Sequence, residues 1–250
     1  MSTVIYALAF YAAAIVLVGG LAHRIWSYAS TPAPLKIPTT PAPLTRSGAV
    51  LRVLREVVLF HSLFKANKWI WLFSWIFHGG LLLVLVCHLR YFLQPVWSLV
   101  ALVQPFGVYA GMAMVGALTA LWARRIIVPR IRYISGPSDH LLLLLLIGIG
   151  GSGLVMRYAA HTDIVAVKAF FLGLIRFHWQ PLPADAALLA HLTMVIVAML
   201  VFPFSKLLHA PGVFFSPTRN QADDTRERHY RPRGARAARL SPDVLLGTSP

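Results

Sequence analysis

Five long apolar stretches constrain what this chain of 250 residues can fold into. They cover about residues 4–24, 69–93, 97–122, 139–157 and 186–208. Each is close to or longer than the roughly 20 residues that a helix needs to cross a bilayer. A helix also satisfies its backbone hydrogen bonds within one segment, as lipid requires. The sequence therefore predicts an all-α integral membrane protein, a five-transmembrane-helix bundle within residues 1–209.

The segments outside these stretches carry further expectations. Residues 47–65 have an apolar side with scattered basic residues, so we expect a surface helix in the headgroup layer or against a partner subunit. Residues 164–177 are interrupted by two basic residues and predict another surface helix. Five prolines in residues 31–43 predict an extended linker. Residues 210–250 predict a cytoplasmic docking segment followed by a basic, disordered tail.

Charge predicts the orientation of the bundle. The formal net charge is +15, and 19 of the 23 Lys and Arg residues fall in the first loop, the third loop and the C-terminal segment. Under the positive-inside rule we expect the N-terminus outside and the C-terminus in the cytoplasm. Topology thus accounts for the charge, and we expect no nucleic acid partner. The single cysteine, Cys87, excludes an intrachain disulfide and an iron–sulfur cluster held by this chain alone.

Four histidines are confined to two of the apolar stretches. His78 and His88 lie in the second, His191 lies in the fifth and His209 ends it. A ligating side chain at membrane depth is costly and usually functional. On one helix, residues 18 apart share a face and residues ten apart lie roughly 80° apart. The two spans are antiparallel, so depth pairs His88 with His191 at the outer side and His78 with His209 at the inner side.

Histidines on both faces of a haem fill both axial positions of the iron, which favours electron transfer. The pattern therefore predicts two haem b groups. The alternative for a single membrane histidine is packing or proton relay. The two separations rise about 15 and 27 Å, so a tilt, an inclined haem or a bend at Pro203 must absorb the difference. The small residues of 148–153 favour either close helix packing or room for a macrocycle.

Further candidates surround the histidines. Arg90 and Arg157 near the outer side, and Lys65 and Lys68 near the inner side, are expected to contact haem propionates or to anchor headgroups. Polar and aromatic groups near the outer haem predict a site for a quinone headgroup. The residues of this site are His88, Arg90, Trp97 and Tyr109. We expect no catalytic side chain, because the redox chemistry would belong to the haems and the quinone.

This arrangement resembles the gamma subunit of respiratory nitrate reductase, a dihaem cytochrome b with five spans. The resemblance rests on the four histidines and on the stretch Phe77-His78-Gly79-Gly80. Two further stretches, 60–69 and 206–221, are similar to the M subunit of the Dsr membrane complex of dissimilatory sulfur metabolism (DsrM). The nitrate reductase relatives use a lysine of span three at their quinol site. Val108 falls near that place here, so the pocket does not carry over residue by residue.

The resemblance implies a subunit that carries electrons between the quinone pool, menaquinone or ubiquinone, and a cytoplasmic iron–sulfur subunit related to heterodisulfide reductase. Further membrane and periplasmic haem c subunits would be neighbours, in the bacterial inner membrane. One alternative is a gamma subunit of a respiratory nitrate reductase that passes quinol electrons to its iron–sulfur subunit. Another is a transporter with histidine proton relays, which the lack of intramembrane carboxylates and of an internal repeat disfavours.

Overall fold

The computed structural model describes residues 2–32 and 41–223. Every regular element within that part is a helix, and five helical segments are long and apolar enough to cross a membrane. The five segments are Ser2–Ser30, Lys68–Tyr91, Ser98–Ile127, Pro137–Ala160 and Ala186–Phe204. The predicted five-span, all-α architecture is therefore confirmed, and the chain is a multi-pass membrane protein. The predicted tail beyond residue 223 and the middle of the predicted linker lie outside the described residues.

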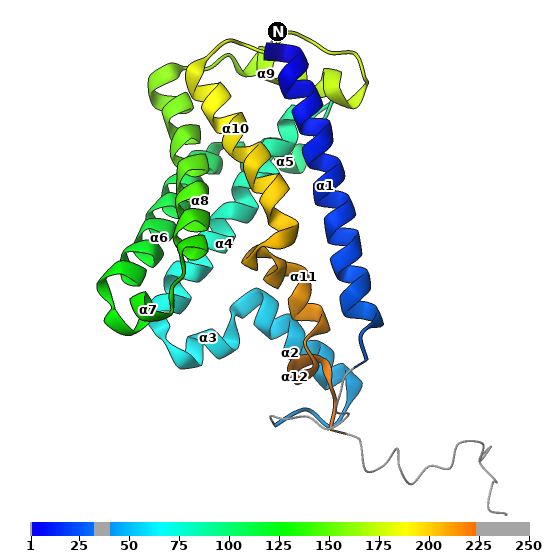
Figure 1. The fold of residues 1–250 in the computed structure, drawn as a ribbon, viewed down its shortest axis with the longest axis vertical. Coiled ribbons are helices and arrows are strands. Elements are labelled where there is room, and N and C mark those ends of the chain that lie inside the picture. Colours follow the sequence, from blue (N-terminus) through cyan, green and yellow to red (C-terminus); the bar gives the residue numbers. More distant parts are fainter. Residues whose placement is uncertain (1, 33–40, 224–250) are drawn as a thin grey trace, which may run out of the picture.

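The spans alternate in direction, and short helices lie at both ends of the bundle (Figure 1). The spans consist of α1 (Ser2–Ser30), α4 (Lys68–His88) with η1 (Leu89–Tyr91), α5 (Ser98–Val103), η2 (Gln104–Phe106) and α6 (Gly107–Ile127), α8 (Pro137–Val155) with η3 (Met156–Ala160), and α10 (Ala186–Val201) with η4 (Phe202–Phe204). The shorter elements are α2 (Arg46–Leu59), α3 (His61–Ala66), α7 (Pro129–Ile134), α9 (Ile164–Ile175), η5 (Lys206–Leu208), α11 (His209–Gly212), η6 (Val213–Phe215) and α12 (Pro217–Asn220).

The two ends of the bundle differ in charge. The start of α1 and helix α9 lie at one end, which we call the N-terminal end (Figure 1). Helices α2, α3, α7, α11 and α12 lie at the other, which carries most of the described Lys and Arg residues and which we call the basic end. The alternation of the spans thus gathers the basic loops at one end, as the charge pattern requires. Which end faces the cytoplasm stays a prediction.

The spans pack in a row. Helix α4 packs on α6, α6 on α8, α8 on α10, and α10 on α1. Close approach depends on glycine, since a Cβ on Gly80 of α4 would lie 2.9 Å from the Ala110 carbonyl oxygen of α6. Helix α4, which carries His78 and His88, and helix α10, which carries His191, therefore have different principal neighbours.

Helix α9 closes the N-terminal end. Val167, Phe170, Phe171 and Leu174 of α9 form the main buried cluster with Ala7 of α1 and residues of α10. Asp163 caps the helix by accepting hydrogen bonds from the amides of Val165 and Ala166. The predicted helix over 164–177 thus exists as Ile164–Ile175, with one face buried against two spans.

The single surface helix expected over 47–65 is wrong in one respect, because the segment forms two helices. Phe60 has φ 47° and separates α2 from α3. Its amide donates to the Glu56 carbonyl at 3.1 Å and so terminates α2. The Glu56 side chain then accepts from the amide of Ser62 at 3.2 Å in the first turn of α3. One carboxylate therefore joins the two helices across the break.

The fifth span, which was expected over 186–208 with a possible bend at Pro203, is interrupted at that proline. Helix α10 ends at Val201, and Ser205 is extended with φ −111° and ψ 174°. Pro203 has no amide proton to continue the helix. It is buried against α1, where a Cβ on Gly20 would lie 2.5 Å from it. His209 therefore begins α11 on a separate segment, and helix periodicity does not place it.

Candidate functional site: two histidine pairs between α4 and α10

The four histidines of α4, α10 and α11 lie in two pairs. The ring centroids of His88 and His191 are 6.5 Å apart, and the planes meet at 13°. The centroids of His78 and His209 are 6.0 Å apart, with the planes at 88°. The structure thus brings together the same couples that depth matching predicts. His78 and His88 are ten residues apart, whereas His191 and His209 are 18 residues apart. The break in the helix at Pro203 lets the two pairs form despite this difference.

Every one of these rings has its Nδ1 atom engaged. Nδ1 of His78 lies 2.7 Å from the Ser74 carbonyl oxygen, and Nδ1 of His88 lies 2.7 Å from that of Val84. Nδ1 of His209 lies 2.8 Å from the Lys206 carbonyl oxygen. A carbonyl can only accept, so each Nδ1 carries the proton and each Nε2 keeps its lone pair. Metal-ligating histidines use this same division of roles.

His191 is held by α8 instead of its own helix. Its Nδ1 lies 2.9 Å from Ser152 Oγ and 3.0 Å from the Ile149 carbonyl oxygen. The Ser152 hydroxyl donates to the same carbonyl at 3.0 Å, so its lone pair accepts from His191. Ser152 is not among the residues that the sequence pattern indicates. The sequence feature that could have indicated Ser152 is its hydroxyl, which lies within a run of glycines at membrane depth.

The spacing of both pairs fits an iron with two imidazole ligands. A metal–nitrogen bond of about 2 Å and a further ~1 Å from Nε2 to the ring centre put the two centroids about 6 Å apart. Both observed separations match this value. No group of three or more metal-ligating His, Cys, Asp or Glu side chains occurs in the part of the chain that the structure describes. Two ligands per site suit a metal whose other ligands come from a macrocycle.

The glycine-rich run of α8 serves the first of the two roles that its composition suggested, close helix packing. A Cβ on Gly148 would lie 2.8 Å from Met194 Sδ, and one on Gly150 would lie 2.5 Å from Val115 Cγ2, so these two glycines allow close packing. A Cβ on Gly151 would meet nothing within 4 Å. The same holds for Gly79, which follows His78. A Cβ on Gly153 would lie 3.7 Å from His191 Cε1, in ordinary contact with the ring, and room for a macrocycle beside the run stays a prediction.

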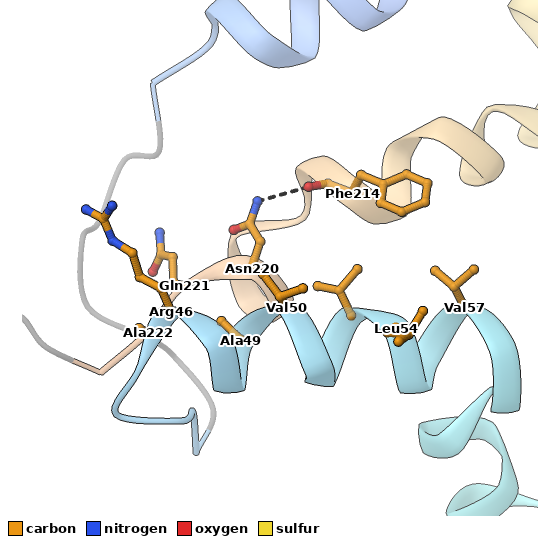
Figure 2. Close-up of a pocket in the computed structure, with 10 residues that line it drawn as sticks. Arg46, Ala49, Val50, Leu54, Val57, Phe214, Asn220, Gln221 and Ala222 are labelled. Carbon is orange, nitrogen blue, oxygen red and sulfur yellow. Dashed lines mark hydrogen bonds between the residues drawn. The ribbon is translucent and has the colours of Figure 1, made fainter.

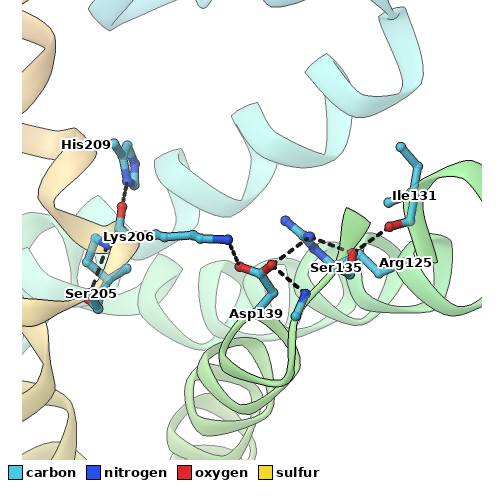
Figure 3. Close-up of polar contacts among 9 residues, drawn as sticks. Arg125, Ile131, Ser135, Asp139, Ser205, Lys206 and His209 are labelled. Atoms are coloured by element: carbon cyan, nitrogen blue, oxygen red, sulfur yellow. Dashed lines mark hydrogen bonds and ion pairs between the residues drawn. The ribbon is translucent and has the colours of Figure 1, made fainter. Parts of the chain in front are cut away.

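The caps of α10 and of η5, the turn directly before His209, fix the starts of the segments that lead to His191 and His209. Asp185 caps α10 by accepting from the amide of Ala187 at 2.9 Å and from the Thr162 hydroxyl. The Thr162 hydroxyl and the backbone amides lower the pKa of Asp185 despite its burial. Before His209, Ser205 Oγ accepts from the amide of Leu207 at 3.2 Å. The carboxylate of Asp139 binds Lys206 in the same segment (Figure 3).

The four candidate propionate partners lie at the two ends of the bundle. Arg90, at the N-terminal end, is half-buried and donates to Gln104 Oε1 at 3.1 Å. Arg157, at the same end, is exposed. Lys65 and Lys68 are exposed at the basic end. Each candidate thus lies at the end where it was expected, and its role stays a prediction.

Only part of the predicted quinone site comes together. His88 lies beside Tyr91, with centroids 5.8 Å apart, and the Arg90 guanidinium lies 5.6 Å from the Tyr91 ring. Trp97 and Tyr109 are 62% and 69% exposed, as expected of aromatic side chains near a membrane surface.

Gln104, which the sequence pattern does not indicate, joins this group. Its Nε2 donates to the Cys87 carbonyl oxygen at 2.8 Å, and its Oε1 accepts from Arg90. The sequence feature that could have indicated Gln104 is a polar side chain next to Pro105 within an apolar stretch.

A cavity of about 760 Å³ lies at the basic end between α2 and the C-terminal segment (Figure 2). Apolar side chains of α2 and Phe214 line its walls, and Arg46, Asn220, Gln221 and Ala222 line one end. Arg219 of α12 binds Glu56 of α2 at 2.8 Å and ties the two segments together. The structure thus joins the two stretches that sequence analysis assigned to partner docking.

Comparison with known proteins identifies relatives of the whole membrane domain. The family model described as nitrate reductase gamma subunit matches residues 60–220, which include all four histidines. Two similar proteins are named "Hdr-like menaquinol oxidoreductase cytochrome b-like subunit". The one from Archaeoglobus fulgidus is 38% identical over 88% of this chain and 80% of its own length. The one from Archaeoglobus profundus is 36% identical over 92% and 82%. The chain belongs to the nitrate reductase gamma subunit family.

Proposed function

We propose that the chain is a dihaem cytochrome b subunit that carries electrons between the quinone pool and a cytoplasmic iron–sulfur subunit. The observation that carries this proposal is the geometry of the two histidine pairs. Each pair has centroids 6.0 or 6.5 Å apart, and each ring has a protonated Nδ1 and a free Nε2. The names of the two archaeal relatives support the link to menaquinol and to a cytochrome b.

The protein's own residues would provide ligands and spacing. His88 and His191 would hold one haem near the N-terminal end, and His78 and His209 would hold the other near the basic end. A haem bound by two imidazoles supplies one-electron transfer and has no open position for substrate. Ten residues of helix between His78 and His88 correspond to about 15 Å, so the two sites lie at different depths. An electron path across part of the membrane follows.

The proposed orientation puts the basic end in the cytoplasm of a bacterial inner membrane, because basic loops are retained there. The quinone would then bind near the outer pair, beside His88, Arg90 and Tyr91. Trp97 and Tyr109 remain candidates for the wall of this site. The names of the relatives favour menaquinone over ubiquinone.

The basic end would dock the iron–sulfur subunit. Helix α2 exposes Val50 at 68% and Leu54 at 54%, and Phe214 beside them is 55% exposed. Exposed apolar groups of this kind indicate an interface. The term "Hdr-like" in the names of the relatives supports a partner related to heterodisulfide reductase, and hence a role in dissimilatory sulfur metabolism. Further membrane and periplasmic haem c subunits would complete the complex.

Haem stoichiometry and histidine substitutions test the proposal. We expect two haem b groups per chain in protein purified from membranes. His88→Ala and His191→Ala should each remove the same spectral component, and His78→Ala and His209→Ala should each remove the other. His23→Ala, at an exposed histidine of α1, is the matched control and should remove neither. Protein without haem would refute the function, and loss of one component in both the His88 and His209 variants would refute the pairing.

Co-purification tests the partner. Phe214→Ser should release the iron–sulfur subunit while both haems stay bound. Tyr133→Ser is the control, because Tyr133 of α7 is 92% exposed at the same end but lies outside the proposed surface. A full complement of iron–sulfur subunit in the Phe214→Ser protein would place the docking surface elsewhere.

A further inference from the structure

Asp139 is the one buried carboxylate at the basic end within the described ranges. Its exposure is 5%, and the other buried polar or charged residue of the described ranges, His191, belongs to the histidine pair at the N-terminal end. Both carboxylate oxygens are engaged. Oδ1 lies 2.5 Å from Lys206 Nζ, and Oδ2 accepts from the Gly136 amide at 3.2 Å (Figure 3). Arg125 lies 3.8 Å from Oδ2.

Lys206 connects this carboxylate to His209. The side chain of Lys206 binds Asp139, and its backbone carbonyl accepts from Nδ1 of His209 at 2.8 Å. The same residue is thus held at one end by α8 and orients the imidazole at the other. The segment that carries Lys206 and His209 is not part of α10, because α10 ends at Val201 and Ser205 is extended. A contact with α8 can therefore fix its position. His78, by contrast, is oriented by a carbonyl of its own regular helix.

We propose that Asp139 and Lys206 form a positioning pair for His209 and thereby set the geometry of the basic-end histidine pair. This inference rests on the proposed function, since the ring that the pair orients is the proposed haem ligand. A carboxylate on α8 would hold Lys206 so that its carbonyl fixes both the tautomer and the direction of the His209 ring. Support of this kind for a ligating histidine typically changes metal affinity about 10-fold or more when it is removed.

Asp139 could instead act only by stabilising the first turn of α8. Two substitutions separate this role from the positioning of His209. Asp139 is the third residue of α8 and accepts from the amide of the N-cap residue Gly136, and asparagine offers an acceptor oxygen in a side chain of the same size, so Asp139→Asn keeps this contact. It removes the negative charge that attracts Lys206. Lys206→Gln removes the same ion pair from the other side and leaves the cap untouched. A pure capping role therefore predicts no change in either variant.

The experiment compares haem content and electron paramagnetic resonance (EPR) spectra in the purified full-length protein. The basic-end haem is identified beforehand as the component lost in His209→Ala. We expect Asp139→Asn and Lys206→Gln each to weaken binding of this haem about tenfold at limiting haem and to change its EPR signal. The other haem should stay unchanged. Lys206→Arg keeps the positive charge and should leave haem binding and the EPR signal as in the wild-type protein. Arg125→Gln, which removes the longer contact with Asp139, should have a smaller effect than Lys206→Gln.

The outcomes distinguish this inference from the proposed function. If the wild-type protein binds two haems and His209→Ala loses one, but Asp139→Asn and Lys206→Gln leave that haem unchanged, the positioning role is refuted and the function stands. An equal effect on both haems would also refute it, because a general loss of stability would then explain the result. If His209→Ala removes no haem, the proposed function itself fails.

Discussion

Replacement of Ser152 by alanine isolates the contribution of a single hydroxyl to one histidine pair. The Ser152 hydroxyl accepts a hydrogen bond from His191 Nδ1 at 2.9 Å and donates to the Ile149 carbonyl. An acceptor at Nδ1 makes an imidazole a more basic ligand, which favours oxidised iron. Ser152→Ala removes this acceptor. We therefore expect a higher midpoint potential for the haem that we propose is held by His88 and His191.

The structure sets the size of this effect. A neutral hydrogen bond contributes a net ~1 kcal/mol, within a range of about 0.5–1.5 kcal/mol. For a one-electron couple this range corresponds to about 20–65 mV. The Ile149 carbonyl oxygen lies 3.0 Å from the same Nδ1 and remains after the substitution. The expected rise is therefore in the lower half of the range, about 20–40 mV.

The assay is a redox titration of the purified protein with both haems followed separately. Ser74→Ala is the matched control, because His78 binds the Ser74 backbone carbonyl, which alanine also provides. We expect no shift in that variant. A fall in the potential of the His88–His191 haem in Ser152→Ala, or an equal shift of both haems, would refute the reasoning.

Three further predictions follow from the geometry. The planes of one histidine pair meet at 13° and those of the other at 88°. Perpendicular planes keep two iron d orbitals close in energy, so oxidised protein should give two distinct low-spin EPR signals, the more anisotropic one lost in His209→Ala. Burial opposes ionisation of Glu56, but Ser62 and Arg219 outweigh it and lower the pKa of Glu56. The link between α2 and α12 should therefore be retained above the ordinary value of 4.5 and lost as pH falls through the lowered pKa. Thermal unfolding between pH 3 and 7 should show this acid sensitivity, and Glu56→Gln should abolish it. Reporter fusions at Gly136 and Pro181 should report cytoplasm and exterior respectively, and the opposite result would invert the topology.

Much of the architecture could be predicted from the sequence because it depends on local composition. An apolar run of about 20 residues specifies a span wherever it occurs in the chain. The five spans and their alternation follow, and so does the gathering of basic loops at one end. Antiparallel direction then pairs histidines of similar depth, and the same couples lie together in the structure. These inferences use only distance along a helix and the sign of charge.

Tertiary contacts decided the features that local patterns could not. Helix periodicity failed for His209, because Pro203 packs on α1 and the chain turns before this histidine begins α11. Ser152 reaches His191 from 39 residues away in the sequence, and Asp139 reaches Lys206 across 67. Such contacts depend on how α8 packs against α10 and its extension. The sequence by itself therefore determined the spans and which histidines share a depth, and only the packing of those spans decided what holds each ring in place.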